Sequence, residues 1–193
     1  FHESTPVFTK DGKTMYFTRN NFLDGKRGKD SKSVTLLKMY KSTLVNGQWT
    51  NIIELPFNSD NYSVAHPALS LDEKTLYFAS DMPGTLGQSD LFKVTINENG
   101  TYSSPENLGA KINTEGRETF PTISAENELY FASDGRPGLG GLDIYVTRLD
   151  ENQNIGEIQN IGEPVNSPKD DFAFLINSET RKGFFTSNRD GGK

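Results

Sequence analysis

The stretch AHPALSLDEKTLYFASD, residues 65–81, places a proline-containing apolar run, a polar turn and an aromatic run in direct succession. Three further stretches repeat this order: STPVFTKDGKTMYFTRN at 4–20, TFPTISAENELYFASD at 119–134 and DFAFLINSETRKGFFTSN at 171–188. Self-similarity at roughly fifty to sixty residues indicates a repeat architecture. We align the copies on two sets of positions: Pro6, Pro67, Pro121 and Ala173, and Tyr16, Tyr77, Tyr130 and Phe184.

Each copy separates into four short β-strands. In the second copy these are the runs PALSL, TLYFAS, DLFKVTI and the more polar TYSSPENL, with the turn Asp72-Glu73-Lys74 between the first two. In the first copy Asn46-Gly47 separates the third run from the fourth, and Asn-Gly between apolar runs is the strongest short-range hairpin signal. No window shows sustained helical periodicity. Repeated units of four antiparallel strands predict the blades of a β-propeller.

The predicted fold is therefore all-β, with blades at approximately 4–55, 64–108 and 118–161 and an incomplete blade at 171–193. Propellers close with about four to eight blades, and an open ring leaves unpaired strand edges. We expect these three and a half blades to be part of a longer chain that forms a ring of six to eight blades, or a fragment held by a partner. A four-bladed ring closed by itself is the less favoured alternative.

The composition suits such a fold and narrows the partners. Only 33% of the 193 residues are hydrophobic, while Phe (13) and Tyr (7) far outnumber Trp (1). The net charge of −6 argues against nucleic acid as a partner, because phosphate binding needs a basic surface. The chain has no apolar run near the ~20 residues that span a bilayer. It has no cysteine, which excludes disulfides and thiolate metal sites and is compatible with either periplasm or cytosol.

Two Gly/Pro-rich loops connect the second and third strands of their copies: SDMPGTLGQSDLF at 80–92 and SDGRPGLGGLDIY at 133–145. Glycine supplies the positive-φ positions that a tight loop needs. The flanking aspartates can accept hydrogen bonds from loop N–H groups, or can supply, with loop carbonyls, the hard oxygen ligands that Ca²⁺ prefers. Calcium is the one cofactor that the sequence suggests, and these candidate ligands are Asp81, Asp90, Asp134 and Asp143.

In the first copy the same connection is longer and basic, NNFLDGKRGKDSKSVTL at 20–36. It is either a solvated loop or a docking contact for an acidic partner surface or an anionic envelope polymer, since loops on a rigid scaffold often carry binding specificity. The candidate partner-binding residues are Lys26, Arg27, Lys29 and Lys32.

An asparagine recurs in each connection between copies, at Asn58, Asn113 and Asn166. We interpret it as a turn residue whose side chain bonds nearby backbone, in preference to a ligand contact.

Catalytic patterns are weak. The two histidines are His2 and His66, and His66 stands where the aligned copies have Thr5, Phe120 and Phe172, which indicates a packing position. No G-x-S-x-G motif is present, and no Ser–His–Asp set can be nominated.

Residues 9–15 resemble the Asp-box of propeller sialidases only superficially, because Asp and Gly are adjacent and no Trp follows. Glu3, Glu118 and Asp170 precede the innermost strands and are expected to rim one end of the central channel, where propeller glycosidases need convergent carboxylates. We predict that the chain is not an enzyme.

The phrases STPVFTKDGKTMYFTRN, HPALSLDEKTLYFASD and SDGRPGLGGLDIY resemble the WD-like propeller repeats related to TolB, over essentially the whole chain. More specifically, they are similar to the version found in OmpA-family envelope proteins of Bacteroidetes. Members of that family combine a helical-repeat region, this propeller, a small β-sandwich and an OmpA-like domain that grips peptidoglycan. Some of them belong to the type IX secretion and gliding machinery.

The resemblance implies a non-catalytic scaffold for protein–protein contacts in a periplasmic, outer-membrane-associated assembly. Other envelope proteins would be its partners, and peptidoglycan would be bound indirectly through an OmpA-like domain outside this sequence. Two alternatives stay open: recognition of a small ligand or glycan at the central channel, and an accessory domain of a hydrolase.

Overall fold

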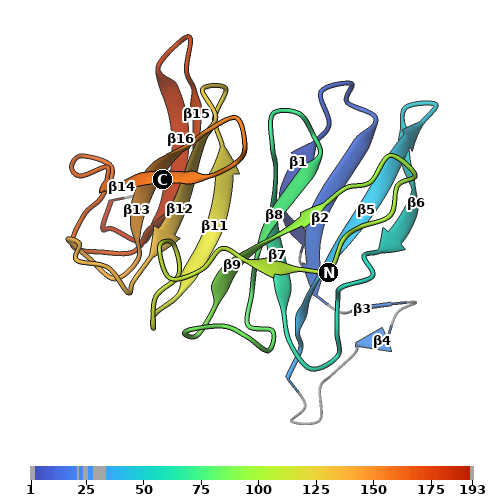
Figure 1. Cartoon of the computed structure of the whole chain (residues 1–193), viewed down its shortest axis with the longest axis horizontal. Coiled ribbons are helices and arrows are strands. Elements are labelled where there is room, and N and C mark those ends of the chain that lie inside the picture. The colour runs from blue at the N-terminus through green and yellow to red at the C-terminus, as the bar shows by residue number, and fades with distance from the viewer. Residues whose placement is uncertain (1–2, 21, 24–25, 28–33, 192–193) are drawn as a thin grey trace.

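The computed structural model describes residues 3–20, 22–23, 26–27 and 34–191, with the backbone alone at 22–23 and 26–27. These residues form β-strands and turns and contain no helix, so the all-β prediction is confirmed (Figure 1). No helix in the described part of the chain is therefore long and apolar enough to cross a membrane.

Three four-stranded antiparallel sheets follow one another along the chain, and a two-stranded sheet follows them. The first contains β1 (Glu3–Phe8), β2 (Thr14–Asn20), β5 (Leu37–Val45) and β6 (Gln48–Glu54). The second contains β7 (Val64–Leu69), β8 (Thr75–Ser80), β9 (Asp90–Thr95) and β10 (Glu106–Asn107). The third contains β11 (Glu118–Ile123), β12 (Glu128–Ser133), β13 (Asp143–Leu149) and β14 (Ile155–Asn160). The last contains β15 (Asp171–Asn177) and β16 (Lys182–Ser187), and a small separate hairpin pairs β3 (Phe22–Leu23) with β4 (Lys26–Arg27).

The first strand of each sheet lies innermost, where β1 contacts β7, β7 contacts β11, and β11 contacts β15. The sheets stand side by side as blades, with the hairpins between first and second strands at the upper end of Figure 1 and the connections to the third strands at the lower end. This is the arrangement of a β-propeller, with three whole blades and the first two strands of another. The total number of blades in the ring stays a prediction.

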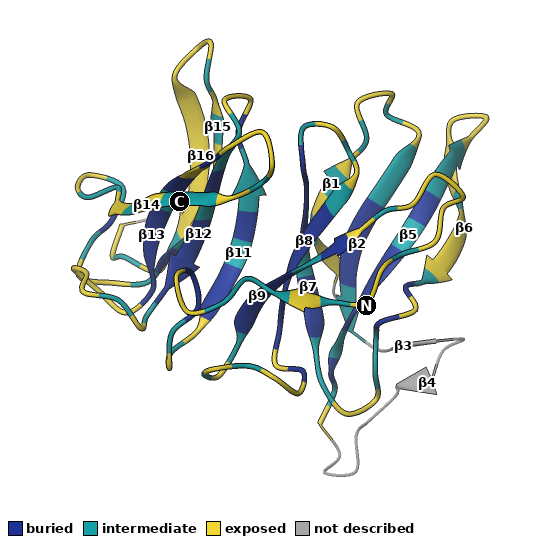
Figure 2. Cartoon of the chain, viewed as in Figure 1, coloured by how far each residue is buried: buried dark blue, intermediate teal, exposed yellow. Residues whose placement is uncertain are grey.

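Aromatic and aliphatic side chains fill the spaces between blades. Because side chains alternate along a strand, β8 sends Phe78 toward the first blade and Tyr77 toward the third. Phe78 stacks on Phe57 with ring centroids 4.9 Å apart, and Tyr77 packs among residues that include Phe131. Each fully buried Phe contributes about 2–3 kcal/mol of transfer free energy. The dark-blue strand segments in Figure 2 mark these inter-blade cores.

Two turn regions test the predicted strand pairs. Asn46 and Gly47 have φ of 51° and 77° between β5 and β6, as a type I′ hairpin requires, so this hairpin is confirmed. The fourth strand of the second copy is shorter than expected, with only β10 and an isolated bridge at Tyr102 in ladder pairing. Pro105 has no backbone N–H to donate to the neighbouring strand. The N–H of Thr95 donates to the hydroxyl of Ser103 and not to a backbone carbonyl of that segment.

All four inner strands carry a β-bulge at one register. In β7, for example, pairing to β8 skips from Ala65 to Ala68. Positive φ is uncommon for residues other than glycine. The same strained geometry recurs at each inner strand, so the bulge is a regular feature of the repeat and not a local irregularity. The bulged residues and their φ values are Thr5 (46°), His66 (59°), Phe120 (50°) and Ala173 (53°).

These bulges correct the alignment of the fourth copy. Ala173, which we had placed with the prolines, has the backbone of His66 and Phe120, and Phe174 takes the proline position. Spacing carried this signal, since Phe174 precedes Phe184 by the interval that separates Pro6 from Tyr16 in the first copy. The apolar identity of the neighbouring Phe172 concealed the one-residue shift.

Candidate functional site

A row of aromatic rings follows the inner strands across blade boundaries. The imidazole of His66 on β7 stacks on Phe120 of β11, with ring centroids 3.8 Å apart and planes 15° apart. Phe120 in turn lies 4.7 Å from the ring of Phe172 on β15. His66 therefore packs as an aromatic residue in this row.

Hydrogen bonds hold His66 on both sides. Its backbone N–H donates to Thr18 Oγ1 at 2.8 Å, and its Nδ1 lies 2.8 Å from Thr119 Oγ1. Burial lowers the pKa of His66 to about 4, because the charged imidazolium loses hydration there. The ring is therefore neutral at pH 7.

Two hollows meet at His66. The hollow toward the β7–β8 hairpin measures about 140 Å³ and is largely apolar. The hollow toward the β8–β9 loop measures about 200 Å³, and its lining residues include Ser80, Gln88 and Thr119. The apolar hollow is lined by Thr5, Pro6, Val7, His66, Pro67, Ala68, Leu69, Phe120, Pro121, Thr122, Ile123, Ala173 and Leu175.

The buried carboxylate of Glu118, the first residue of β11, has three internal donors. Its Oε2 accepts the N–H of Thr114 at 2.7 Å, and its Oε1 accepts the hydroxyls of Thr114 and Ser133 at 2.7 and 2.5 Å. Glu118 is fully buried and lines neither hollow. The expectation that it rims the channel is wrong, because this connector loop wraps its side chain.

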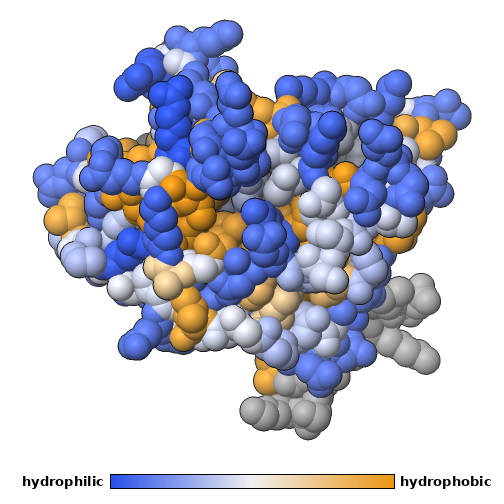
Figure 3. Space-filling model, in the orientation of Figure 1, coloured by the Kyte–Doolittle hydropathy of each residue, from blue (hydrophilic) through white to orange (hydrophobic). Residues whose placement is uncertain are grey.

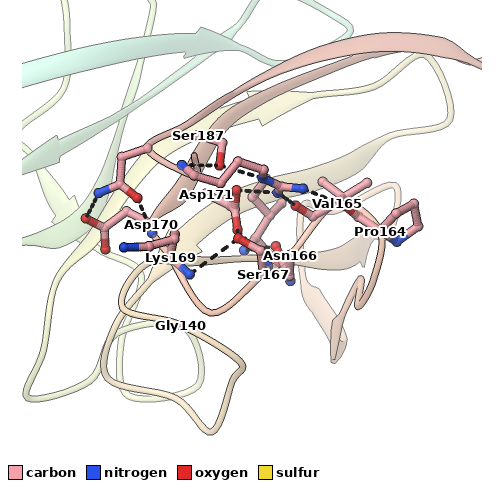
Figure 4. Close-up of polar contacts among 12 residues, drawn as sticks. Gly140, Pro164, Val165, Asn166, Ser167, Lys169, Asp170, Asp171 and Ser187 are labelled. Atoms are coloured by element: carbon pink, nitrogen blue, oxygen red, sulfur yellow. Dashed lines mark hydrogen bonds and ion pairs between the residues drawn. The ribbon is translucent and has the colours of Figure 1, made fainter. Parts of the chain in front are cut away.

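Asp171 repeats this arrangement at the start of β15 (Figure 4). Its Oδ2 accepts the N–H and hydroxyl of Ser167, both at 2.7 Å, and its Oδ1 accepts Arg189 Nη2 at 2.6 Å. Burial alone raises the pKa of Asp171, but hydrogen bonds from Ser187, Arg189 and Ser167 outweigh burial and lower the pKa below its ordinary value. The two carboxylates therefore fasten the inter-blade connectors.

The other two acids expected at the channel are also engaged elsewhere. Asp170 Oδ1 accepts the N–H of Leu142 at 2.9 Å and its Oδ2 accepts the Asn188 amide at 2.9 Å. Glu3 pairs with Arg19, whose Nε donates to it at 2.7 Å. The register equivalent of Glu118 in the fourth blade is Asp171 and not Asp170, since Glu118 and Asp171 both open their inner strands.

Asp90 and Asp143, two of the calcium candidates, are buried and cap their own loops. Asp90 Oδ2 accepts the N–H of Leu86 at 2.8 Å, and Asp143 Oδ2 accepts the N–H of Leu139. Asp143 Oδ1 also accepts the N–H of Gly140 at 3.2 Å, whereas Asp90 Oδ1 is buried without a hydrogen-bond partner among the described residues. These contacts agree with the expectation that the aspartates accept hydrogen bonds from N–H groups of the loop.

Asp81 and Asp134, the other two candidates, hold the residues that lead into the inner strands of their own blades, β7 and β11. Asp81 Oδ1 accepts the N–H of Ser63 at 2.6 Å, and Asp134 accepts the N–H and the Nε of Arg117 at 2.6 and 2.7 Å. Within residues 3–20 and 34–191, no three His, Asp or Glu side chains gather as a metal site would require. A calcium site at these loops stays a prediction.

The recurring asparagines are clamps between distant segments. Asn113 Oδ1 accepts the N–H of Leu91 at 2.8 Å and its Nδ2 donates to the Leu91 carbonyl at 3.0 Å. Asn58 and Asn166 bond both backbone groups of Met39 and Ile144 in the same way. We had interpreted them as bonding nearby backbone, but their partners lie 19 to 22 residues earlier, on the third strand of the preceding blade.

Two arginines that the sequence did not single out secure the same connectors. Arg136 donates to the carbonyls of Lys111 and Ile112, the latter at 2.9 Å, and Arg189 donates to Pro164 at 3.0 Å and to the next carbonyl. Each guanidinium also lies over a blade aromatic, with Arg189 5.1 Å from the Phe185 ring centroid. Their positions differ by one residue between copies, so no fixed spacing marked them.

An exposed aliphatic side chain recurs before the third strand of each whole blade. Val34, Leu86 and Leu139 are 51%, 51% and 47% exposed. Val34 stands four residues before Lys38, which pairs with Arg19, the last residue but one of β2. Leu86 and Leu139 stand four residues before Asp90 and Asp143, which pair with the last residues of β8 and β12. No sequence pattern marks this array, because the three connections differ in length and only strand register aligns them.

The basic insertion occupies the corresponding connection of the first blade. Lys26 and Arg27 form β4, a two-residue strand that pairs with β3 within this connection, and their role in binding a partner stays a prediction. Lys29 and Lys32 lie outside the described residues.

No protein-family model and no curated protein sequence matches the chain. Solved structures match it in fold. TolB from Acinetobacter baumannii superimposes with a TM-score of 0.59 at 12% sequence identity, over 99% of this chain and 39% of that chain. The chain has the fold of a TolB-like β-propeller. Putative TolB from Agrobacterium tumefaciens gives a TM-score of 0.53 at 15% identity, over 99% of this chain and 72% of that one.

Propellers of hydrolases are similar as well. An α-L-arabinofuranosidase from Lactobacillus brevis gives a TM-score of 0.58 at 13% identity, covering 99% of this propeller chain and 67% of the enzyme. The propeller spans only about two fifths of the A. baumannii TolB chain. At these identities the matches establish the fold alone. The TolB-like part of the sequence resemblance is thus confirmed, and the OmpA-family part stays a prediction.

Proposed function

We propose that this propeller is a non-catalytic scaffold that binds other proteins in a bacterial envelope assembly. The array of exposed aliphatic side chains on the β8–β9 and β12–β13 loops carries the proposal. Leu86 and Leu139 project from loops whose backbone N–H groups are bonded to buried carboxylates. Anchors held in place in this way lose little conformational entropy when a partner covers them.

The loops that present these leucines also pack on the connectors beside them. The N–H of Gln88 donates to the Gly116 carbonyl at 2.9 Å, and a Cβ on Gly87 would lie 2.4 Å from that same oxygen. Glycine is required there because two backbones touch. The β8–β9 loop therefore lies directly against the connector between β10 and β11, at the lower end of its blade in Figure 1.

The acidic side chains favour a scaffold over a propeller hydrolase. A glycosidase needs paired carboxylates that face a substrate. Here the carboxylate oxygens of Glu118 and Asp171 accept hydrogen bonds from the connectors and from the C-terminal ends of the second strands of their own blades. The carboxylates of Glu118 and Asp171 therefore stabilise the fold by holding the connectors.

We propose a periplasmic location with attachment to the outer membrane and cell wall through an OmpA-like domain. The fold shared with proteins titled TolB and the sequence resemblance to envelope repeats support this location. The acidic net charge and absence of cysteine are compatible with it. More specifically, we propose that the protein belongs to a type IX secretion or gliding assembly.

Site-specific photocrosslinking in the source bacterium tests the proposal. A photoreactive phenylalanine analogue at Leu86 or Leu139 should give discrete adducts with envelope proteins, identified by mass spectrometry. The same analogue at Val45, which is 44% exposed on β5, is the matched control. Adducts with cytosolic proteins, or equal adducts at Val45, would overturn the proposal. The double variant Leu86→Asp, Leu139→Asp should keep its unfolding midpoint and lose the adducts formed from a third loop position, Thr85.

A further inference from the structure

The apolar hollow beside His66 is built from equivalent positions of four inner strands. Its wall includes the bulged residues Thr5, His66 and Phe120 and, from the fourth strand, Ala173. The prolines that follow the first three bulges line it as well. Proline has a single φ region and no N–H to satisfy, so this wall is stiff and apolar. Hydrophobic side chains also gather left of centre on the face seen in Figure 3.

The lining contains no charged side chain among the described residues. Its two threonine hydroxyls are already bonded within the protein: Thr122 Oγ1 donates to the Phe174 carbonyl at 2.7 Å, and Thr5 Oγ1 lies 3.3 Å from Thr18 Oγ1. The imidazole Nδ1 of His66 is held by Thr119. A charged ligand would therefore find no oppositely charged side chain in this lining.

The volume of the hollow matches one six-membered ring. It measures about 140 Å³. A cavity of about 150 Å³ lined by apolar side chains holds one benzene molecule. The stacked rings of His66 and Phe120 form part of its wall. Aromatic rings gain from offset or edge contacts with such surfaces beyond the area they bury.

We propose that this hollow is a binding site for a small, uncharged, single-ring aromatic compound. The ring lies among the inner-strand prolines, in contact with Phe120 and the His66 imidazole. The site narrows the sequence-based alternative of a small ligand or glycan toward an apolar ligand, because most of its lining is apolar. It does not depend on the partner surface at Leu86 and Leu139.

Methyl-detected NMR titration of the 193-residue chain with toluene tests the site. We expect saturable shifts of the methyl signals of Val7, Ala68, Ala173 and Leu175, and no such shifts with benzoate, which carries a charge on the same ring. Absence of saturable shifts up to the solubility limit of toluene would overturn the proposal. Equal shifts with benzoate would do so as well.

A pair of valine substitutions locates the site. Val7→Phe places a ring in the hollow and should weaken toluene binding at least ~10-fold. Val45→Phe, at an exposed position of β5, should leave binding unchanged. Equal affinity in the two variants would overturn the assignment. His66→Phe keeps an aromatic wall at a position where Phe120 shows that Phe is tolerated, so it should retain binding within ~3-fold and provides a folded control if Val7→Phe proves unstable.

Discussion

Asn113 bonds both backbone polar groups of Leu91, at 2.8 and 3.0 Å, although the two residues lie 22 positions apart. The side-chain amide takes the place of a neighbouring strand and joins the connector to the preceding blade. Asn58 and Asn166 repeat this clamp at Met39 and Ile144. Each blade junction is therefore fastened by a buried polar pair beside the apolar core.

Replacing the clamp should destabilise the fold. Asn113→Ala removes both bonds and leaves the N–H of Leu91 buried without its acceptor, while the Leu91 carbonyl keeps the N–H of Leu108, so we expect a loss of about 1–3 kcal/mol in the free energy of unfolding. Urea unfolding followed by circular dichroism measures it. Asn154→Ala, at an exposed turn, is the control and should stay within ~0.5 kcal/mol of the parent chain. An equal effect of the two substitutions would contradict the clamp.

Glu118 should be required for its charge as well as its size. Glu118→Gln keeps the shape, but its NH₂ group replaces one of the two oxygens and cannot accept the hydrogen bonds from Thr114 or Ser133 that end on that oxygen. We expect a loss of about 1–3 kcal/mol in unfolding free energy. Glu115→Gln, at an exposed position three residues earlier, should change stability by less than ~0.5 kcal/mol. An unchanged free energy of unfolding in Glu118→Gln would show that the connector does not depend on the carboxylate.

His66 should make the fold less stable in mild acid. Its folded-state pKa of about 4 lies below the ordinary value of 6.5, so the unfolded chain binds a proton first as the pH falls. Stability due to this group is therefore complete above pH 6.5 and decreases toward pH 4, by about 3 kcal/mol in total. Urea unfolding between pH 4 and 7.5 measures the slope. His66→Phe should remove this part of the slope, and an unchanged slope would refute the assignment.

The glycine at 138 is required by contact and not by backbone angle. A Cβ there would lie 2.1 Å from Asp143 Oδ2. Gly138→Ala should therefore cost about 1–3 kcal/mol, measured by thermal or urea unfolding. In the background Asp143→Ala the same substitution should cost less, because the clashing oxygen is gone. Strictly additive effects would argue that the loop avoids the clash by moving.

Local signals decided the secondary structure and the repeat. Alternating apolar residues, the Asn46-Gly47 turn and the proline at corresponding positions of three copies predict four-stranded blades from short-range preferences alone. The loop-capping role of Asp90 and Asp143 also follows from composition, because unpaired N–H groups in a glycine loop need an acceptor. Each of these features depends on neighbours within a few residues.

The candidate sites depended on contacts between blades, which local preferences do not contain. The bulges shifted the fourth copy by one residue, and with it the identity of the acid at the start of β15, Asp171 in place of Asp170. The array of Val34, Leu86 and Leu139 and the hollow at His66 exist only because strands far apart in sequence pack at fixed register. Sequence by itself determined what each blade is made of. The tertiary structure decided which side chains of different blades meet. The physical reason is that packing between blades sets which polar groups are buried with hydrogen-bond partners and which apolar side chains remain exposed to solvent.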